Sequence, residues 1–574
     1  MARTARLTAA LVIALLLVAA VLVWRAGRGP APASAPAPVG GQLVATIRSE
    51  PRTFNRYIGR DSASETVSLL TQAKLVRVNR TTGEIEPWLA DSWTMAPDGL
   101  SYTVKLRPGV TFSDGVPFTS ADVVFAFEAL YDDKVASPVA DSVTVGGKRL
   151  EVSAPDATTV AIRFPSPFGP GLRLLDNVPI LPKYKLDAAL RAGTFASAWG
   201  PTTPPSEMSG LGPFVLEEYQ AGQRLVFGRN PHYWRRDPDG VTLPYLDRLI
   251  LEIVPDQNAE LLRLQAGETD LTQSEVRPED YATLKRQAEA GRLRLEDVGL
   301  GLDLDSLWFN LKPAAKARDP RRAWLQSGEL RQAISEAVDR RAFAESVFLG
   351  AAVPSYGAVS PGNTRWYATD VPADPYDPGA ARTLLAGLGL VDGNGDGMLE
   401  DRSGAPVRFT LLTMKGNSPL ERGAAFLREE LRKVGISVDV VPLETGAVVQ
   451  RIEGGDYDAV YFRFQASDTD PAVNLDLWLT SGAFHVWNPS QMAPATEWER
   501  RVDDLMRQQV SSLDEGQRKW LFAEVQRVLA EHRPLLTFAA PRFLVAISSR
   551  VAHATPAPMR PPVLWNPDIL AVRR

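Results

Sequence analysis

A segment in the last third of the chain carries residue types that suit the binding of a charged group. Residues 460–465 alternate with the two-residue period of a strand, and Phe464 lies on its apolar side. A short polar run follows: Ser467, Asp468, Thr469, Asp470 and Pro471. A carboxylate at a strand end can accept charge-assisted hydrogen bonds from a desolvated ammonium group. The same run also fits an Asp-Pro turn in which Asp470 caps a helix, and the sequence leaves both interpretations open.

A second acidic run has the spacing of a calcium loop. Asp392, Asn394 and Asp396 alternate with glycines, so alternate residues offer oxygen ligands while glycine permits the sharp turn. The twelfth position of the loop is Ser403, where such loops use a bidentate glutamate. The sequence therefore predicts either a structural Ca²⁺ site or a solvated turn, and it predicts no other cofactor.

Further candidates are large or polar side chains without a motif of their own. Trp308 and Trp487 could line a binding cleft, and Asn310 stands two residues after the first of them. Single tryptophans are more often core residues. The chain has no G-x-S-x-G, HExxH or P-loop motif, so we do not expect an enzyme.

Length and composition narrow the class of protein. With 574 residues, of which 45% are hydrophobic, the chain is long enough for more than one lobe. Its net charge of −5 gives no basic surface for nucleic acid. The absence of cysteine excludes disulfides, thiolate metal sites and a lipid-modified cysteine.

The first 41 residues indicate export. Arg3 and Arg6 precede the apolar run 7–24, which as a helix would span roughly 27 Å, close to a bilayer core. Residues 1–28 therefore form a membrane anchor or a signal segment. Residues 29–41 are a linker rich in proline and alanine, which favours an extended spacer. In either case the rest of the chain is exported, and we place it in the periplasm or another extracytoplasmic compartment. We expect it to contact the membrane only through this N-terminal segment.

Residues 90–131 can be interpreted from local chemistry alone. The turn Pro97-Asp98-Gly99 precedes an alternating strand over 100–107. Thr119 is a helix N-cap, and Asp122, three residues later, completes a capping box. The apolar residues that follow form the stripe of an amphipathic helix.

This ordered run resembles the family 5 extracytoplasmic solute-binding proteins, the oligopeptide and dipeptide receptors of ABC importers. Three other runs of the chain are similar to landmarks of the same family: Gly212-Pro213-Phe214, Asn230-Pro231-His232-Tyr233-Trp234, and LRQAISEAVDRRAF over residues 330–343. We expect the last of these to belong to one helix over 330–348. The segments 407–414, 419–434 and 436–441 predict a β-α-β crossover in a parallel sheet.

The resemblance implies an α/β fold of the two-lobed, type II periplasmic-binding-protein (Venus-flytrap) kind, with an extra smaller lobe. Lobe I would be discontinuous and completed by both ends of the chain. The expected divisions are 42–73 (lobe I, first part), 74–200 (smaller lobe), 201–304 (lobe I, second part), 305–534 (lobe II) and 535–574 (return to lobe I).

The resemblance also implies a function and a set of site positions. The protein would be a monomer that captures a peptide or similar small solute by hinge closure and delivers it to ABC permease and ATPase subunits. Tyr57, Asp61 and Ser62 lie where the family's chain enters the cleft. In peptide-binding members an aspartate four residues before the proline holds the peptide's amino group; that position is Ser467 here, and Asp468 fits only if the loop is one residue shorter. A membrane-tethered envelope hydrolase and an envelope sensor are the competing functions.

Overall fold

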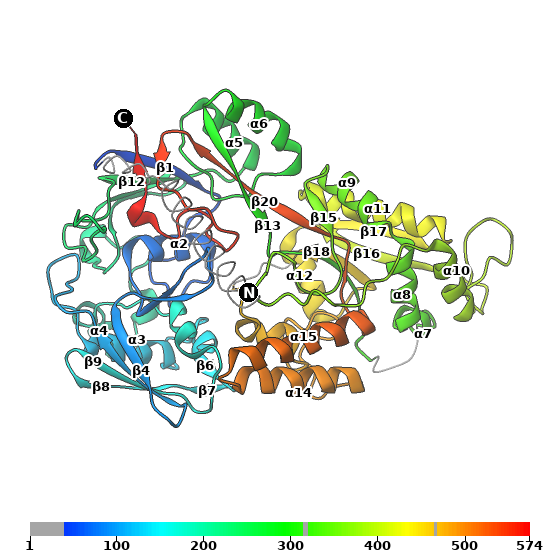
Figure 1. Ribbon diagram of the computed structural model, residues 1–574, viewed down its shortest axis with the longest axis horizontal. Helices are drawn as coiled ribbons and strands as arrows, with labels where there is room; N and C mark the ends of the chain where they lie inside the picture. The colour runs from blue at the N-terminus through cyan, green and yellow to red at the C-terminus, as the bar shows by residue number, and fades with distance from the viewer. Residues whose placement is uncertain (1–38, 314–318, 464–467, 574) are drawn as a thin grey trace, which may run out of the picture.

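The computed structural model describes residues 39–313, 319–463 and 468–573, and these residues form two α/β bodies joined side by side (Figure 1). In the first body a four-stranded sheet has the order β1-β12-β11-β10, and β1 pairs parallel with β12. The main elements around this sheet are β1 (Gln42–Ile47), α2 (Ser62–Thr71), β2 (Val76–Val78), β3 (Ile85–Pro87), β10 (Phe214–Gln220), β11 (Arg224–Arg229), β12 (Arg248–Ile253), α5 (Gln257–Ala266), α6 (Tyr281–Glu289), β21 (Val551–Ala552) and β22 (Ala571–Val572).

The first body contains a second sheet, which is entirely antiparallel and has the order β4-β5-β9-β8. The strands and helices here are β4 (Ala90–Met95), β5 (Ser101–Leu106), α3 (Ser120–Tyr131), β6 (Thr144–Val145), β7 (Lys148–Arg149), β8 (Glu151–Asp156), β9 (Thr159–Arg163), the 3₁₀ helix η2 (Gly171–Asn177) and α4 (Lys183–Ala192). The predicted cap of α3 is present, because the Thr119 N–H donates to the Asp122 carboxylate at 2.9 Å. One continuous apolar core joins this region to the first sheet, from Leu43 through Phe125 to Val572. The two regions therefore form a single packed body.

The second body is built on a five-stranded sheet of order β17-β16-β18-β14-β19. Its elements are β14 (Asp305–Phe309), α7 (Arg322–Leu325), α8 (Gly328–Ala337), α9 (Arg340–Phe348), β15 (Ala352–Pro354), α10 (Pro378–Gly387), β16 (Arg408–Met414), α11 (Ser418–Lys433), β17 (Ser437–Leu443), α12 (Thr445–Gly454), β18 (Ala459–Arg463), α13 (Leu475–Trp478), α14 (Glu497–Ser511), α15 (Glu515–His532) and β19 (Leu536–Thr537). The predicted crossover is confirmed: β16 and β17 are parallel, and α11 connects them.

The predicted helix over 330–348 is wrong in one respect, because the structure divides it into α8 and α9. Asp339 lies at the break with extended backbone geometry, and its carboxylate accepts from the N–H groups of Arg341 and Ala342. An aspartate that caps a new helix competes with the continuation of the old one. The apolar stripe of both helices still faces one core.

Two crossings of the chain join the bodies. Residues 300–305 lead from β13 (Leu293–Leu300) into β14, and β20 (Ala539–Ser548) returns. The first part of β20 pairs with β15 of the second body and the remainder with β13 of the first, so one strand bridges both (Figure 1). Gly299 in β13 has φ +100, which only glycine adopts readily. A pair of adjacent crossing strands is the arrangement that permits hinge motion.

The return of the chain to lobe I was expected at residue 535, but the structure places it later. β19 pairs with β14 in the sheet of the second body, and residues 539–541 pair with β15. The apolar run at 535–538 therefore belongs to the core of the second body. Short buried strands carry no signal for the sheet they join.

No helix within residues 39–313, 319–463 and 468–573 is long and apolar enough to cross a membrane. The predicted anchor or signal segment, residues 1–28, lies outside the described residues.

Candidate functional site

The predicted binding segment follows β18, which ends at Arg463 where the second body faces the first. Phe464 and Ser467 lie outside the described residues. Asp468 is 9% exposed and receives a bidentate pair from Arg173 of η2, with Nε at 2.9 Å from both carboxylate oxygens and a terminal nitrogen at 2.5 Å from Oδ1. The candidate anchor is thus paired with a cation from the opposite body.

Asp470 has a different partner, within its own body. Its carboxylate accepts two hydrogen bonds from Arg518 of α15, at 2.6 and 2.9 Å, and a third from the N–H of Ala472. Asp470 and Arg518 are both buried, and the guanidinium also stands 4.8 Å from the ring centre of Trp366. Asp470 therefore caps the turn after Pro471 and fixes it to α15, as the turn interpretation of the sequence predicted.

The other end of the segment also contacts the first body. Arg463 donates to Asp305 at 2.6 Å and to Glu275 at 2.5 Å. Burial alone would lower the pKa of the Arg463 guanidinium, but the Asp305 and Glu275 carboxylates raise it above its ordinary value. Arg463 therefore stays charged and links the two bodies beside their crossing strands.

Gln273 lies in the loop of the first body that approaches Arg463. The preceding Leu271 bridges to both β1 and β20, and Glu275, two residues later, pairs with Arg463. Both amide atoms of Gln273 are buried, and neither has a hydrogen-bond partner among the described residues. A buried amide without partners is costly unless something else supplies them.

The aromatic candidates are placed in the core. Trp308 and Trp487 are fully buried in the cluster formed with α14 and α15. The Asn310 amide donates to the carbonyls of Gly455 and Tyr457, and its oxygen accepts from the Lys312 N–H. These contacts give all three residues structural roles, and in this conformation their burial argues against direct contact with a solute.

The positions inferred for the cleft entrance also have internal partners. Tyr57 is fully buried, its hydroxyl donates to the Pro179 carbonyl at 2.6 Å, and burial raises its pKa well above the ordinary value. Asp61 caps α2 by accepting from the Ser64 N–H, and Ser62 is the exposed first residue of that helix. The helix cap thus accounts for one oxygen of Asp61; the other is buried without a partner among the described residues.

The acidic loop at 392–397 uses its oxygens internally. The Asp392 carboxylate accepts from the N–H groups of Gly395 and Gly397, and Asn394 and Asp396 each accept from a nearby backbone N–H. Glu400, the ninth residue of the loop, accepts from Gly393 and Asn394. Within the described part of the chain, no group of three or more His, Asp or Glu side chains is arranged to hold a metal ion. This geometry supports the solvated turn.

Calcium removal is accordingly expected to leave stability unchanged. A ligand that binds only the folded state raises Tm by mass action, so a loop that binds no ion gives equal Tm values in EDTA and in millimolar calcium. Differential scanning calorimetry measures this directly. A rise of several degrees with calcium, lost in Asp392→Ala, would restore the metal interpretation.

Sequence reasoning did not identify Arg173 or Gln273. Arg173 lies in a 3₁₀ helix 295 residues before its partner, and no periodicity marks it. Gln273 had a weak signal, because it stands in the polar run 272–275. Its position at the junction becomes visible only when β1, β20 and Leu271 are seen together.

Comparison with known proteins identifies the family. The sequence profile of the bacterial extracellular solute-binding proteins of family 5, middle region, matches residues 84–485, well over half of the chain. The chain belongs to this family. Its fold is the two-lobed type II periplasmic-binding-protein fold, which the structural neighbours share.

Individual relatives match this chain over most of their length. A probable ABC transporter-binding protein of Deinococcus radiodurans is 26% identical over 89% of each chain. The oligopeptide-binding protein AppA of Bacillus subtilis is 27% identical over 86% of this chain and 85% of its own. The structure of AppA with a nonapeptide superimposes with a TM-score of 0.73, covering 94% of this chain and all of AppA. NikA of Brucella suis with Fe(III)-EDTA gives a TM-score of 0.74 at 22% identity, covering 93% of this chain and all of NikA, which shows a shared fold.

Proposed function

We propose that this family 5 protein captures a peptide or similar small solute between its two bodies and delivers it to the permease of an ABC importer. The observation that carries the proposal is the construction of the junction: two separately packed bodies meet at charged groups beside two crossing strands. A solute that contacts both bodies favours the closed state by its differential affinity. The likeness to AppA, whose structure contains a nonapeptide, supports a peptide as the solute class.

The experiment is to identify what the exported protein retains when it is purified from its own cells. Native mass spectrometry should find one small solute per chain, and denaturation should release it unchanged. Incubation of the emptied protein with a peptide pool should give saturable binding without new products. Product formation at a steady rate would favour the envelope hydrolase, and the absence of any saturable binding would contradict solute capture.

Gln273 is the side chain of the first body that we propose for solute contact. Its buried amide can donate to a carbonyl and accept from an N–H, the two groups that an extended peptide presents. Main-chain recognition of this kind tolerates many side chains, which suits broad specificity.

Substitution Gln273→Leu is expected to weaken solute binding about five- to thirtyfold, the value of one or two hydrogen bonds of about 1 kcal/mol. Isothermal titration calorimetry with the retained solute measures the loss. Gln223→Leu, at an exposed turn of the same body, is the matched control and should change nothing. Equal affinity of the Gln273 and Gln223 variants would remove Gln273 from the site.

We also propose a cellular location and an oligomeric state for the protein. The family is extracellular by its description, and we propose that residues 1–28 hold a monomer at the inner membrane through the linker 29–41. Fractionation of cells, with detection of the intact N-terminus by mass spectrometry, distinguishes an anchor from a cleaved signal.

A further inference from the structure

We infer that Arg173 and Asp468 form a clasp that holds the two bodies closed on each other, and that Asp468 is therefore not the anchor of a solute's ammonium group. The inference deepens the proposed capture by hinge closure and rests on it. It concerns a protein-to-protein contact, so it can be measured without any solute.

Each residue of the clasp is fixed within its own body. On η2, Leu172, Leu174 and Leu175 are buried in the core of the first body. On the same turn Asp176 accepts from the Val78 N–H and pairs with Lys74 and Arg80. Arg173 is thus held on a rigid support and points toward the second body.

Asp468 is likewise fixed by contacts within the second body. Its Oδ1 accepts from the N–H of Asp470 at 2.9 Å, and Asp470 is fixed to α15 by Arg518. Neither partner can follow the other when the bodies separate. The distance between the guanidinium and the carboxylate therefore reports closure itself.

The Arg173 guanidinium finds hydrogen-bond acceptors in both bodies. Arg173 donates to Asp468 through two nitrogens, to the Gly83 carbonyl at 2.5 Å and to the Thr469 hydroxyl at 3.3 Å. Arg173 is 6% exposed, so a solute could reach this ion pair only after the bodies part. An ammonium group that used Asp468 would have to displace a bidentate arginine, the stronger partner for a carboxylate.

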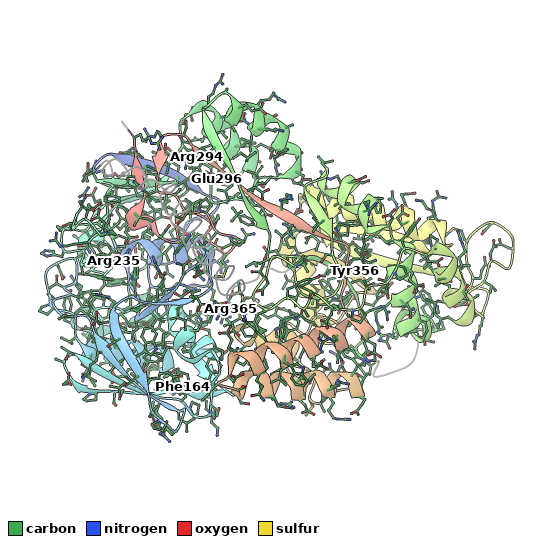
Figure 2. All side chains as sticks on the ribbon, viewed as in Figure 1. Phe164, Arg235, Arg294, Glu296, Tyr356 and Arg365 are labelled. Carbon is green, nitrogen blue, oxygen red and sulfur yellow. The ribbon has the colours of Figure 1, made fainter. Side chains whose placement is uncertain are left out.

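Neighbouring contacts extend the clasp along the junction. Arg365 of the second body donates to Glu84 of the first at 2.5 Å and to Glu515 of α15 at 2.9 Å, and Figure 2 shows it between the bodies. The Gly169 N–H donates to the Val510 carbonyl at 2.6 Å. A Cβ at position 169 would stand 2.2 Å from the Ser512 carbonyl oxygen, so the backbones approach as closely as glycine permits.

The charges predict how variants behave. Removing one partner leaves the other buried without a counter-charge in the closed state, whereas removing both leaves neutral groups. Arg173→Met or Asp468→Asn should therefore favour the open state. The double variant should recover most of the closed population. If Asp468 were instead the ammonium anchor, Arg173→Met would free it, and peptides would bind more tightly.

The first measurement uses the full exported chain without solute. Because the sequence contains no cysteine, spin labels at Lys148→Cys and Gln508→Cys are the only ones attached, one on each body. The solute-free parent closes part of the time, so double electron–electron resonance should show a smaller short-distance population in both single variants than in the parent, and a return toward the parent in the double variant. Arg163→Met, at an exposed ion pair within the first body, is the control and should match the parent. Single variants whose distance distributions match that of the parent would overturn the clasp.

The second measurement separates the clasp from solute recognition. Trialanine, hexa-alanine and their N-acetylated forms are titrated into the parent and the Arg173→Met variant. For every peptide that the parent binds, the clasp predicts about tenfold weaker binding to the variant, free and acetylated alike. Tighter binding of the free-amine forms to the variant would overturn it. If no peptide binds the parent, the peptide proposal fails while the distance measurement still decides the clasp.

Discussion

Substitution Asp470→Ala is expected to lower the free energy of unfolding of the second body by about 3–5 kcal/mol. The reason is the partner left behind: Arg518 is only 4% exposed, and Asp470 is the carboxylate that pairs with it. A buried guanidinium without its counter-charge keeps the desolvation cost and loses the compensating attraction. Urea denaturation followed by circular dichroism measures the loss.

Two further variants make the Asp470 prediction specific. Asp439→Ala breaks an exposed pair, because the Asp439 side chain is 40% exposed and that of its partner Arg408 is 59% exposed. This substitution should lower the free energy of unfolding by less than about 1 kcal/mol. Asp470→Leu combined with Arg518→Met should recover part of the loss, because neutral side chains of similar size replace the pair. A loss for Asp470→Ala no larger than that for Asp439→Ala would show that the pair does not hold the turn.

Substitution Trp487→Ala is expected to destabilise the second body by about 3–5 kcal/mol while leaving the solute affinity of the folded protein unchanged. The indole is fully buried, its ring centre lies 4.1 Å from that of His485 and 6.3 Å from that of Trp498, and α14 and α15 cover it. Thermal unfolding and calorimetric titration on the same samples measure both quantities.

Trp520 is the matched control for Trp487. It lies on α15 with 59% of its surface exposed, so Trp520→Ala should cost less than about 1 kcal/mol. If Trp487→Ala instead lost affinity at unchanged stability, Trp487 would line the cleft, as the sequence alone allowed.

Local patterns predicted the elements whose causes are local. The crossover β16–α11–β17 follows from two apolar strands around an amphipathic helix, and the cap of α3 follows from Thr119 and Asp122. The helix over 330–348 failed for an equally local reason, because the capping tendency of Asp339 outweighed a continuous apolar stripe.

The candidate site was less predictable because its contacts join distant parts of the chain. Asp468 was chosen for its charge, but its partner Arg173 is 295 residues away and belongs to the other body. Tyr57 was chosen by position, and only the folded chain shows its hydroxyl bound to Pro179. Residue type reports what a side chain can do, whereas burial and partners decide what it does.

Small-angle X-ray scattering of the exported chain, with its retained solute and after the solute is removed, tests the central claim most directly. The two bodies should move apart about their crossing strands when the solute leaves, so the radius of gyration should increase, and it should return to the original value when the solute is added back. Identical profiles in the two states, together with demonstrated solute binding, would contradict capture by closure.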